Sequence, residues 1–489
     1  MENLPNKLYK VTQVLEFEKR AIEDFGISSY ELMSLAGEEV FQAIRLKWPN
    51  VKSISIFCGS GNNAGDGYVV ARLAKEENLT VKVYSLIDPD FLTGDVLIAC
   101  QHYQNLHGLI VPFDDQIVDN SDIVVDALLG TGLNRQVSGS YALAIIKINN
   151  SVSPVVSIDL PSGLNADTGT VMGCSVKADI TVTFIALKQG LFTGQAPEYC
   201  GELVYSSLKL PDSVFKDVLP SSIRGYKKLW PSRSRCAHKG TYGHVLIVGG
   251  NVGYSGSVKL AAEAALRIGA GLISIATHQS HAAFLNINRP ELMCHGVANS
   301  QDLSLLLNKA TVVVIGPGLG QNTWAQELFN TVLMTDKPLV IDADGLNLLA
   351  KSPSSNSNWI LTPHPGEAAR LLNCTSAEIQ DDRFSAVLAL QSKYEGVVVL
   401  KGAGTLIASE QECIVSSTGN PGMASGGMGD VLAGVIAGLI AQGESLIDAS
   451  QHGVYGHGYA ADLAAVANGE RGLLAGDLMM YLRQWINNF

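Results

Sequence analysis

One aspartate in this sequence has surroundings typical of a phosphoryl-transfer site. Asp430 follows the glycine-rich run 426–429 and precedes the apolar stretch 431–440, which we expect to be a helix. Backbone amides in such a run, together with the positive end of the helix, bind phosphate groups. A carboxylate there can accept a proton from a hydroxyl group that attacks phosphorus. The alternative is a helix cap, a common role for Asp, but a cap does not require the glycines.

One histidine of the C-terminal half is a further candidate for catalysis. His364 stands between two prolines after the expected strand 359–362, and a further glycine-containing segment lies at 401–405. A lone histidine is also typical of a packed or capping residue. Its place between prolines at a strand end favours a functional role, so both interpretations stay open.

In the N-terminal half, a glycine-rich segment, 59–67, follows the expected strand 53–57. Its spacing is similar to a dinucleotide-binding fingerprint but does not match it. Asn62, Asn63 and Asp66 place three polar side chains in what we expect to be one loop. A tight structural turn is the alternative, but such a turn would not need all three.

Polar side chains also end two further expected strands. Asp126 ends the strand 122–126, and Asp159 and Ser162 follow the strand 154–158. Each aspartate alone is also typical of a cap or turn. Ligands bind at the carboxyl ends of strands in open parallel sheets, so the three loops together predict a site. Asn63, Asp126 and Ser162 are oxygen donors that suit an alkali or alkaline-earth cation.

These motifs require two α/β domains to position them. Short β-branched runs alternate with helical segments in both halves, which indicates mostly parallel sheets covered on both faces. Residues 11–47 show helical spacing, and the stretch 210–240 combines prolines with polar residues and has no apolar period. We therefore expect domains at 1–220 and 221–489. The glycine motifs differ between the halves and no internal repeat is evident, which favours two unrelated units.

Composition argues against several partners. The chain has 34 Lys and Arg against 46 Asp and Glu, a net charge of −12, and no long cationic block. Nucleic acid and acidic membranes are therefore not expected as partners. The eight cysteines show no CxxC spacing and are expected to be reduced thiols. Residues 1–10 lack a signal-peptide pattern, and 431–441 is too short to span a bilayer. We expect a cytoplasmic protein.

The motifs together resemble two modules joined in one chain. Segments 59–67, 126–133 and 159–163 resemble the NAD(P)H-hydrate epimerase domain, a Rossmann-like fold. Segments 239–243, 316–320, 362–367 and 426–430 resemble the ADP- or ATP-dependent NAD(P)H-hydrate dehydratase of the ribokinase-like superfamily. In this order they are similar to the bacterial bifunctional NAD(P)H-hydrate repair family. One departure is Ala64, where the family often has glycine.

The resemblance implies site residues as well as activities. The family epimerises the R and S hydrates of NADH and NADPH, and dehydrates the S form with ADP or ATP hydrolysis. The epimerase residues expected to contact the hydrate are Asn62, Asn63, Ala64, Gly65, Asp66, Gly130, Thr131, Gly132, Leu133, Asn134, Arg135, Gln136 and Asp159. The dehydratase residues expected to contact it are Ala262, Gly318, His364 and Asp430, with the adenine nucleotide on Lys401, Gly402, Ala403, Gly404, Thr405 and Gly429.

The resemblance also implies roles, cofactors and partners. Asp159 and Asp430 are the expected catalytic residues, and Lys188 is expected beside Asp159, with a solvated surface lysine as the alternative. A potassium ion is expected on Asn63, Asp126 and Ser162, and magnesium with the ADP or ATP. The expected partners are the hydrates NADHX and NADPHX and ADP, in a homo-oligomer without nucleic acid or membrane.

Two other functions remain open from the sequence. A ribokinase-like kinase for a vitamin-precursor alcohol would share the glycine-aspartate motif but release a stable phosphorylated product. Alternatively, the N-terminal half is a nucleotide sensor that regulates the C-terminal half. An epimerase requires acid–base chemistry at Asp159, whereas a sensor does not.

Overall fold

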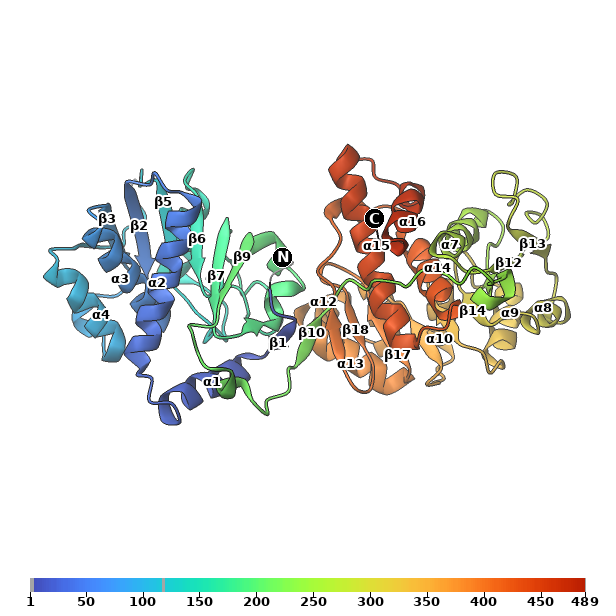
Figure 1. Ribbon diagram of the computed structural model, residues 1–489, viewed down its shortest axis with the longest axis horizontal. Helices are drawn as coiled ribbons and strands as arrows, with labels where there is room; N and C mark the ends of the chain where they lie inside the picture. Colours follow the sequence, from blue (N-terminus) through green and yellow to red (C-terminus); the bar gives the residue numbers. More distant parts are fainter. Residues whose placement is uncertain (1–3, 117–118, 489) are drawn as a thin grey trace. The chain divides into compact units, whose positions relative to one another are not determined.

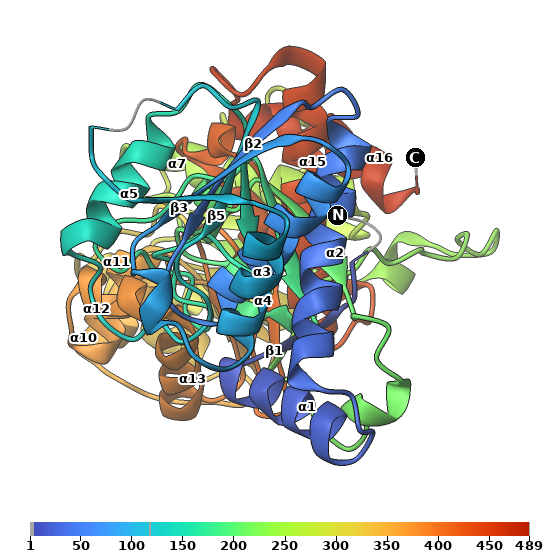
Figure 2. The ribbon, with the colours of Figure 1, turned by 90° about the vertical axis from the view of Figure 1, so that its left-hand side faces the viewer.

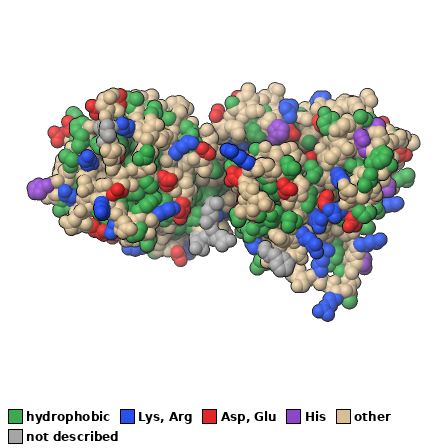
Figure 3. Space-filling model, turned by 90° about the horizontal axis from the view of Figure 1, so that it is seen from above, with side chains coloured by type: hydrophobic (Ala, Val, Ile, Leu, Met, Phe, Trp, Pro, Cys, Tyr) green, Lys and Arg blue, Asp and Glu red, His purple; other side chains and the backbone are tan. Residues whose placement is uncertain are grey.

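The computed structural model describes residues 4–116 and 119–488 and divides the chain into two compact units, Met1–Ser222 and Ile223–Phe489 (Figure 1). We call them unit 1 and unit 2 and describe each by itself. No helix within the described residues has the length and apolar character needed to cross a membrane. On the face in Figure 3, acidic and basic side chains both occur on each unit, as expected for a sequence without a long cationic block.

Unit 1 is built on a parallel sheet. In spatial order its strands are β4 (Leu109–Pro112), β3 (Thr80–Ser85), β2 (Ser53–Cys58), β5 (Ile123–Ala127), β6 (Val155–Ile158), β7 (Ile180–Phe184) and β9 (Glu202–Ser206). A short parallel pair joins β1 (Lys7–Tyr9) to β8 (Leu187–Lys188). Because β2, β5 and β6 are neighbours, their carboxyl ends meet at one edge of the sheet.

Helices cover both faces of this sheet. The helices of unit 1 are α1 (Val11–Glu23), α2 (Ser29–Lys47), α3 (Asn62–Glu76), α4 (Gly94–Asn105), α5 (Gly139–Asn149) and α6 (Ala196–Tyr199), with short 3₁₀ turns η1 (Pro89–Phe91), η2 (Gln189–Phe192) and η3 (Asp212–Phe215). Figure 2 shows α5 on one side of the sheet and α2, α3 and α4 on the other. The larger apolar core lies under the latter helices, and a smaller one lies under α5.

The structure corrects the sequence interpretation of segment 59–67. We expected Asn62, Asn63 and Asp66 in a loop, but α3 begins at Asn62, so all three lie in its first turns. The glycines here serve close packing rather than a turn: a Cβ at Gly65 would lie 2.5 Å from the Met33 side chain. The helix can therefore pack tightly and still carry polar groups at its start.

Residues 11–47 are also not one continuous helix. The chain breaks between α1 and α2, where Gly26 adopts a positive φ of 68° and the Ser28 side chain caps α2. The break lets α1 turn away from the axis of α2, because glycine adopts this backbone conformation without steric cost. Both helices then reach the same cavity of unit 1.

Unit 2 contains a larger sheet that is parallel from β13 to β17 and antiparallel at β18. Its strands, in spatial order, are β13 (Met293–Gly296), β12 (Leu272–Thr277), β11 (His244–Val248), β14 (Val312–Ile315), β15 (Leu339–Ile341), β16 (Trp359–Leu361), β17 (Val397–Leu400), β18 (Leu406–Ala408), β19 (Cys413–Val415) and β10 (Ser222–Arg224). Strands such as β14 are buried throughout, as expected for a sheet covered on both faces.

The helices of unit 2 are α7 (Ser255–Ile268), α8 (Ser300–Leu307), α9 (Thr323–Leu333), α10 (Asp344–Lys351), α11 (Pro365–Leu372), α12 (Ser376–Asp381), α13 (Arg383–Tyr394), α14 (Met428–Ala441), α15 (Leu446–Asn468) and α16 (Leu478–Ile486), with 3₁₀ turns η4 (Lys239–Tyr242), η5 (Pro421–Met423) and η6 (Ala475–Asp477). Helices α7, α14, α15 and α16 form the main core with one face of the sheet. The predicted α/β fold class with parallel sheets is confirmed.

Two helices of this core approach each other unusually closely. A Cβ on Gly434 of α14 would lie 2.0 Å from the carbonyl oxygen of Ala261 in α7, and one on Gly438 would lie 3.1 Å from that of Ala265. Only glycine fits at the first contact. This contact sets the distance between the starts of α7 and α14, where Ser257 and Asp430 lie.

Candidate functional site

Unit 1 contains a cavity of about 640 Å³ at the carboxyl ends of its central strands. Its walls come from α1, α2, the start of α3, the segment after β5, and the ends of β6 and β7. Of the expected hydrate-binding residues, those that line the cavity are Asn62, Asn63, Asp66, Gly130, Thr131, Gly132, Leu133, Asn134, Arg135 and Asp159. Ala64 and Gly65 are buried in α3, and Gln136 is not among the lining residues.

Asp159 and Lys188 form an ion pair in this cavity. The Lys188 ammonium group donates to Asp159 Oδ1, to Thr183 Oγ1 (3.1 Å) and to the Phe184 carbonyl (3.0 Å). The Lys188 side chain is only 2% exposed, so the alternative of a solvated surface lysine is wrong. Thr183 Oγ1 also donates to Asp159 Oδ1, at 3.2 Å. The carboxylate is thus fixed in place by its neighbours.

The backbone at Asp159 is strained. Its φ is +65°, and the Leu160 amide donates to the Ile158 carbonyl at 2.8 Å, so Asp159 is the centre of a γ-turn. Ile185, after the adjacent strand, has the same φ and a matching hydrogen bond from Ala186 to Phe184. Strained residues of this kind cluster at functional sites. The two turns aim Asp159 and Ile185 at the cavity that both line.

Two more carboxyl groups share the cavity with Asp159. Burial raises the pKa of Asp66 well above its ordinary value, the charges of Asp159 and Glu18 raise it further, and Lys188 partly offsets the increase. Burial and Asp159 also raise the pKa of Glu18, with Lys188 again opposing. One ammonium group therefore faces three carboxyl groups. Glu18 and Asp66 bind protons more tightly than ordinary carboxyl groups.

Of the three residues expected to hold a cation, Asp126 and Ser162 are in direct contact, and Asn63 and Ser162 share the Leu129 carbonyl. Ser162 donates to both oxygens of Asp126, from its amide at 2.8 Å and its hydroxyl at 2.6 Å. Asn63 Nδ2 donates to the Leu129 carbonyl at 3.2 Å, and the Ser162 Oγ lies 3.1 Å from the same carbonyl oxygen. Asp126 is fully buried, and no described residue forms an ion pair with it. An oxygen-only set with one buried negative charge fits a monovalent cation.

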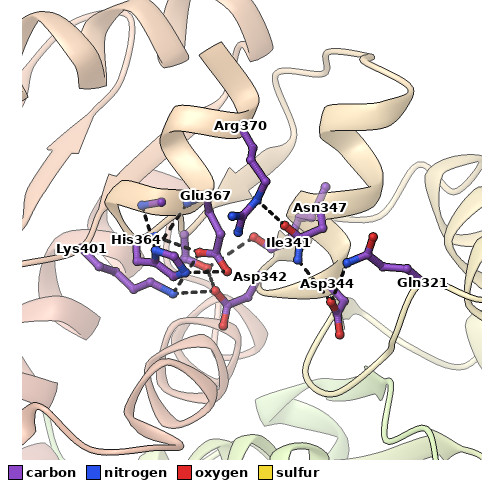
Figure 4. A network of polar contacts seen from close by, with 11 residues as sticks. Gln321, Ile341, Asp342, Asp344, Asn347, His364, Glu367, Arg370 and Lys401 are labelled. Atoms are coloured by element: carbon purple, nitrogen blue, oxygen red, sulfur yellow. Dashed lines mark hydrogen bonds and ion pairs between the residues drawn. The ribbon is translucent and has the colours of Figure 1, made fainter. Parts of the chain in front are cut away.

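Unit 2 gathers a second group of carboxyl groups around one lysine (Figure 4). The Lys401 ammonium group lies 2.8 Å from Asp342 Oδ1 and 3.8 Å from Glu367 Oε2. Burial alone would lower the pKa of Lys401, but Asp342 and Glu367 raise it. Burial raises the pKa of Glu367 to about 7, although Lys401 opposes this. Thr362 donates to the same oxygen, Asp342 Oδ1, at 2.8 Å and so helps to hold that carboxylate in place.

Asp430 belongs to this group and does not cap α14. The N-cap is Gly427, in the left-handed conformation with φ of +90°, and Asp430 stands three residues further on. The capping alternative is therefore wrong. Burial and the charge of Asp342 raise the pKa of Asp430 to about 6, while a hydrogen bond from Ser257 and the charge of Lys401 oppose the increase. A carboxyl group with this pKa is mostly ionised at neutral pH and can accept a proton.

His364 does have the capping role that the sequence left open. Its Nδ1 accepts from the Gly366 amide at 3.0 Å, and the His364 amide donates to Glu367 Oε2 at 2.9 Å. Its Nε2 lies 3.5 Å from Glu367 Oε1, and half of the side chain is exposed. Burial, Lys401 and Arg370 lower the pKa of His364. The ring is thus a neutral group at the mouth of the site.

The remaining expected residues of unit 2 lie in α7, in α14, and in the turns that follow β14 and β17. Ala262 is fully buried in α7. Gly318 has φ of +56° and leaves no room for a Cβ, which would lie 2.6 Å from the Tyr254 carbonyl. Lys401, Gly402, Ala403, Gly404 and Thr405 form the turn between β17 and β18. A Cβ on Gly429 would lie 3.2 Å from Lys401 Nζ, so this glycine keeps the ammonium group accessible.

A separate set of polar contacts lies at a surface cavity of about 590 Å³ between α10 and α11. Arg370 Nε donates to the Asn347 side chain at 2.8 Å, and Asn347 donates to Asp344 at 3.2 Å (Figure 4). Lys351 donates to Gln321 at 2.7 Å.

The sequence analysis did not select every residue of the two groups. Glu18 was missed because it lies on an amphipathic helix far from any glycine motif. Asp342 and Glu367 follow strands, as Asp126 and Asp159 do, and this strand-end signal was available.

The fold and the sites define a class, a two-site α/β enzyme with a carboxylate–lysine group in each unit. The NAD(P)H-hydrate dehydratase family matches residues 245–484, and the YjeF-related protein N-terminus matches residues 29–190. The bifunctional NAD(P)H-hydrate repair enzyme of Coxiella burnetii is 51% identical over 98% of this chain and 99% of its own length. That of Escherichia coli is 41% identical over 99% and 95%. The chain belongs to the family of bifunctional NAD(P)H-hydrate repair enzymes, which confirms the predicted membership.

Solved structures similar to part of the chain include an ADP/ATP-dependent NAD(P)H-hydrate dehydratase from Bacillus subtilis, co-crystallized with ATP and Mg²⁺. It is 30% identical, with a TM-score of 0.48, over 53% of this chain and 93% of its own. A ribokinase-like superfamily protein of Enterococcus faecalis is 31% identical, with a TM-score of 0.48, over 53% and 91%.

Proposed function

We propose that unit 1 interconverts the R and S epimers of NADH and NADPH hydrates, and that unit 2 dehydrates the S epimer with hydrolysis of ADP or ATP. For unit 2, the proposal depends on the position of Asp430. This residue lies in the first turn of α14, after the glycines, and belongs to the same charged group as Lys401. For unit 1, it depends on the Asp159–Lys188 ion pair in a cavity large enough for a nicotinamide ring. The family membership supports both parts.

The arrangement in unit 2 suits elimination through a phosphorylated hydroxyl group. Hydroxide is a poor leaving group, whereas phosphate is a good one. In the proposed reaction Asp430 takes the proton from the hydrate's hydroxyl group as its oxygen attacks the terminal phosphorus. Lys401 and the amides of the glycine turns stabilise charge on the transferred group. The phosphate then leaves, the neighbouring ring carbon loses a proton to solvent, and the electrons of that C–H bond form the ring double bond of NAD(P)H again.

The arrangement in unit 1 suits reversible chemistry at one carbon. Addition of water to an enamine places the hydroxyl group on the carbon next to the ring nitrogen, and the epimers differ there. Interconversion requires proton transfer to and from oxygen near that carbon, and Asp159 is the group fixed for it. We propose Asn62, Asn63, Asp66 and the segment 130–135 as hydrate contacts.

The cofactors complete the proposal. Within the described residues, no group of three or more His, Cys, Asp or Glu side chains is arranged to hold a metal. Magnesium would therefore be carried mainly by the nucleotide's phosphates, next to the carboxylates of Asp342 and Glu367. The nucleotide would lie on the turn 401–405 and Gly429. A potassium ion would lie at Asn63, Asp126 and Ser162, where it would neutralise the buried carboxylate.

Potassium binding is tested by thermal unfolding of unit 1. We expect potassium chloride to raise its Tm relative to an equal concentration of a tetraalkylammonium chloride, because a ligand of the folded state stabilises it. Asp126→Asn removes the charge and is expected to abolish the difference. An equal Tm in both salts would exclude the cation.

The proposed activities are tested with a mixture of R and S NADPH hydrate and the purified chain. With ADP and magnesium the whole mixture should return to NADPH, and without nucleotide only the ratio of epimers should equilibrate. Recovery of the S half alone would remove the epimerase and favour a sensor. A stable phosphorylated product would favour the kinase alternative. We also propose a cytoplasmic homo-oligomer, for which light scattering of the purified chain tests the assembly.

A further inference from the structure

The cavity of unit 1 has a carboxyl group on α1 that lies outside the sequence motifs and before the residues that the YjeF-related N-terminus matches. The family match to this unit begins at residue 29, whereas α1 ends at Glu23. Leu15, Glu18 and Ile22 of this helix nevertheless line the same cavity as Asp66, Asp159 and Lys188. The spacing of three and four residues places these three side chains on one face of α1. Glu18 is therefore the one acidic group that α1 contributes to the cavity.

The chemistry of unit 1 requires more than one proton carrier. When the hydroxyl group leaves, its oxygen must receive a proton; when water returns on the other face of the ring, it must lose one. A single carboxyl group cannot fill both roles, because the acid must start protonated and the base must start ionised. Pairs of carboxyl groups whose surroundings favour opposite protonation states provide such a division of roles. Asp159 forms an ion pair with Lys188, whereas no ion pair involves Glu18 among the described residues.

We propose that Glu18 is a catalytic acid–base residue of the epimerase and works with Asp159 on the hydroxyl-bearing carbon. This inference rests on the proposed function of unit 1. In the R to S direction Glu18 gives its proton to the hydroxyl oxygen, the C–O bond breaks, and water leaves. The lone pair of the ring nitrogen forms a C=N bond. Water then adds to the other face, the π electrons return to nitrogen, and Asp159 accepts the released proton.

The balance of this step is one water lost, one water gained, and one proton moved from Glu18 to Asp159. The return direction uses the same groups in exchanged roles, and exchange with solvent at the cavity resets them. The charged and titratable groups that line the cavity with Glu18 are Asp66, Asp159, Lys188, Arg135 and Tyr141. Of these, Asp159 and Lys188 act on the pKa of Glu18. Burial and the Asp159 charge raise the pKa of Glu18, which supports its starting state as an acid.

The test compares Glu18→Gln with Glu16→Gln in the full chain. Glu16 lies on the same helix, is exposed, and pairs with Arg20, so it controls for loss of a carboxyl group on α1. We expect epimerisation to fall by about 10²–10⁴-fold in Glu18→Gln, the usual contribution of a general acid or base. Glu16→Gln should keep wild-type epimerisation. Both variants should dehydrate the S epimer normally, which reports on unit 2.

A purely structural role of Glu18 predicts a different set of results. It would lower the Tm of unit 1 and leave the shape of the pH profile unchanged. A catalytic Glu18 should leave the Tm near wild type, and the loss of epimerisation at high pH should disappear in Glu18→Gln. Glu18→Asp keeps a carboxyl group, so it should retain this high-pH loss at a reduced rate even if the glutamine variant folds poorly.

Two outcomes would overturn the inference separately. Wild-type epimerisation in Glu18→Gln removes Glu18 from the mechanism while the epimerase stands. A wild-type chain that does not epimerise the hydrates removes the proposed function of unit 1 and this inference with it. Heavy-oxygen water gives a further check, because the step above incorporates solvent oxygen into each epimerised hydrate; unlabelled product overturns it.

Discussion

The two sites contain the same charged groups in different surroundings. Unit 1 places one lysine, Lys188, among three carboxyl groups, and unit 2 places Lys401 among three others. Lys188 is 2% exposed and is enclosed by Thr183 and the Phe184 carbonyl, whereas Lys401 is 19% exposed. Lys401 is therefore the more accessible of the two lysines to an incoming anion.

This difference in burial gives the two lysines different roles, although each lies among three carboxyl groups. A buried lysine acts as an internal counter-ion and fixes one carboxylate, which suits proton transfer at carbon-bound oxygen. A partly exposed lysine beside Gly429 and the start of a helix supplies positive potential for phosphate groups. The comparison predicts that loss of a carboxylate in unit 1 impairs only epimerisation, and that loss of one in unit 2 impairs only dehydration.

The largest expected effect is that of Asp159→Asn. Asparagine tolerates the positive φ at this position, so the backbone should not change, but the substitution removes the base and the partner of Lys188. Epimerisation should fall below detection, measured as conversion of pure R hydrate without nucleotide. Dehydration of the S hydrate by the same preparation is the control. Normal epimerisation would remove Asp159 from the mechanism.

Asp430→Asn should have the next largest effect, on the other reaction. Loss of a general base lowers the rate by about 10²–10⁴-fold, or roughly 3–5 kcal/mol of barrier. Because Gly427 and not Asp430 caps α14, the helix and the Tm should be unaffected. Nucleotide-dependent dehydration is measured, and epimerisation should continue. A near-normal turnover would end the proposal that Asp430 starts the phosphoryl transfer.

A smaller effect is expected in the pH dependence of unit 2. The pKa of Asp430 is raised to about 6, and only its ionised form accepts a proton. Dehydration should therefore be constant near neutral pH and decrease as the pH falls below about 6. Ser257→Ala removes a hydrogen bond that lowers this pKa, so the decrease should begin at higher pH. Ser255→Ala, on the same helix, is the matched control; an identical shift in both variants would contradict the assignment.

The smallest effect should follow separation of the units. Fragments 1–220 and 221–489 keep β10 with its partner β19, so each should retain its core. Each fragment should unfold in one cooperative transition and keep its own activity within a few-fold of the full chain, as calorimetry and the two assays would show. Two unfolded fragments would contradict the expected boundary.

Much of this architecture could be predicted from the sequence, because buried parallel strands appear as β-branched runs with few polar residues. The expected strand 53–57 corresponds to β2 to within one residue. Edge strands such as β4 and β13 carry exposed residues and were missed for that reason. The first turn of α3 was interpreted as a loop because its glycines look like a turn, whereas they allow close packing against Met33.

The sites were predictable where a strand end carries a carboxylate, and less so elsewhere. Asp126, Asp159 and Ser162 follow β-runs in the sequence, and the structure brings Asp126 and Ser162 into contact. Glu18 reaches the cavity from a helix whose sequence looks like any amphipathic surface helix. Contacts of this kind depend on how elements pack, which local spacing does not encode.

The glycine contact between α7 and α14 has a consequence for engineering this protein. Helix-interior glycines such as Gly434 and Gly438 are common targets for stabilisation, since replacement by alanine usually gains about 0.4–1 kcal/mol through the unfolded chain. At Gly434 the new methyl group would meet the Ala261 carbonyl at 2.0 Å, and the helices would have to separate. A variant chosen by helix propensity alone, such as Gly434→Ala, would thus move Ser257 and Asp430 apart and lower the rate of dehydration. The same substitution at Gly438, with 3.1 Å available, is the more tolerant choice.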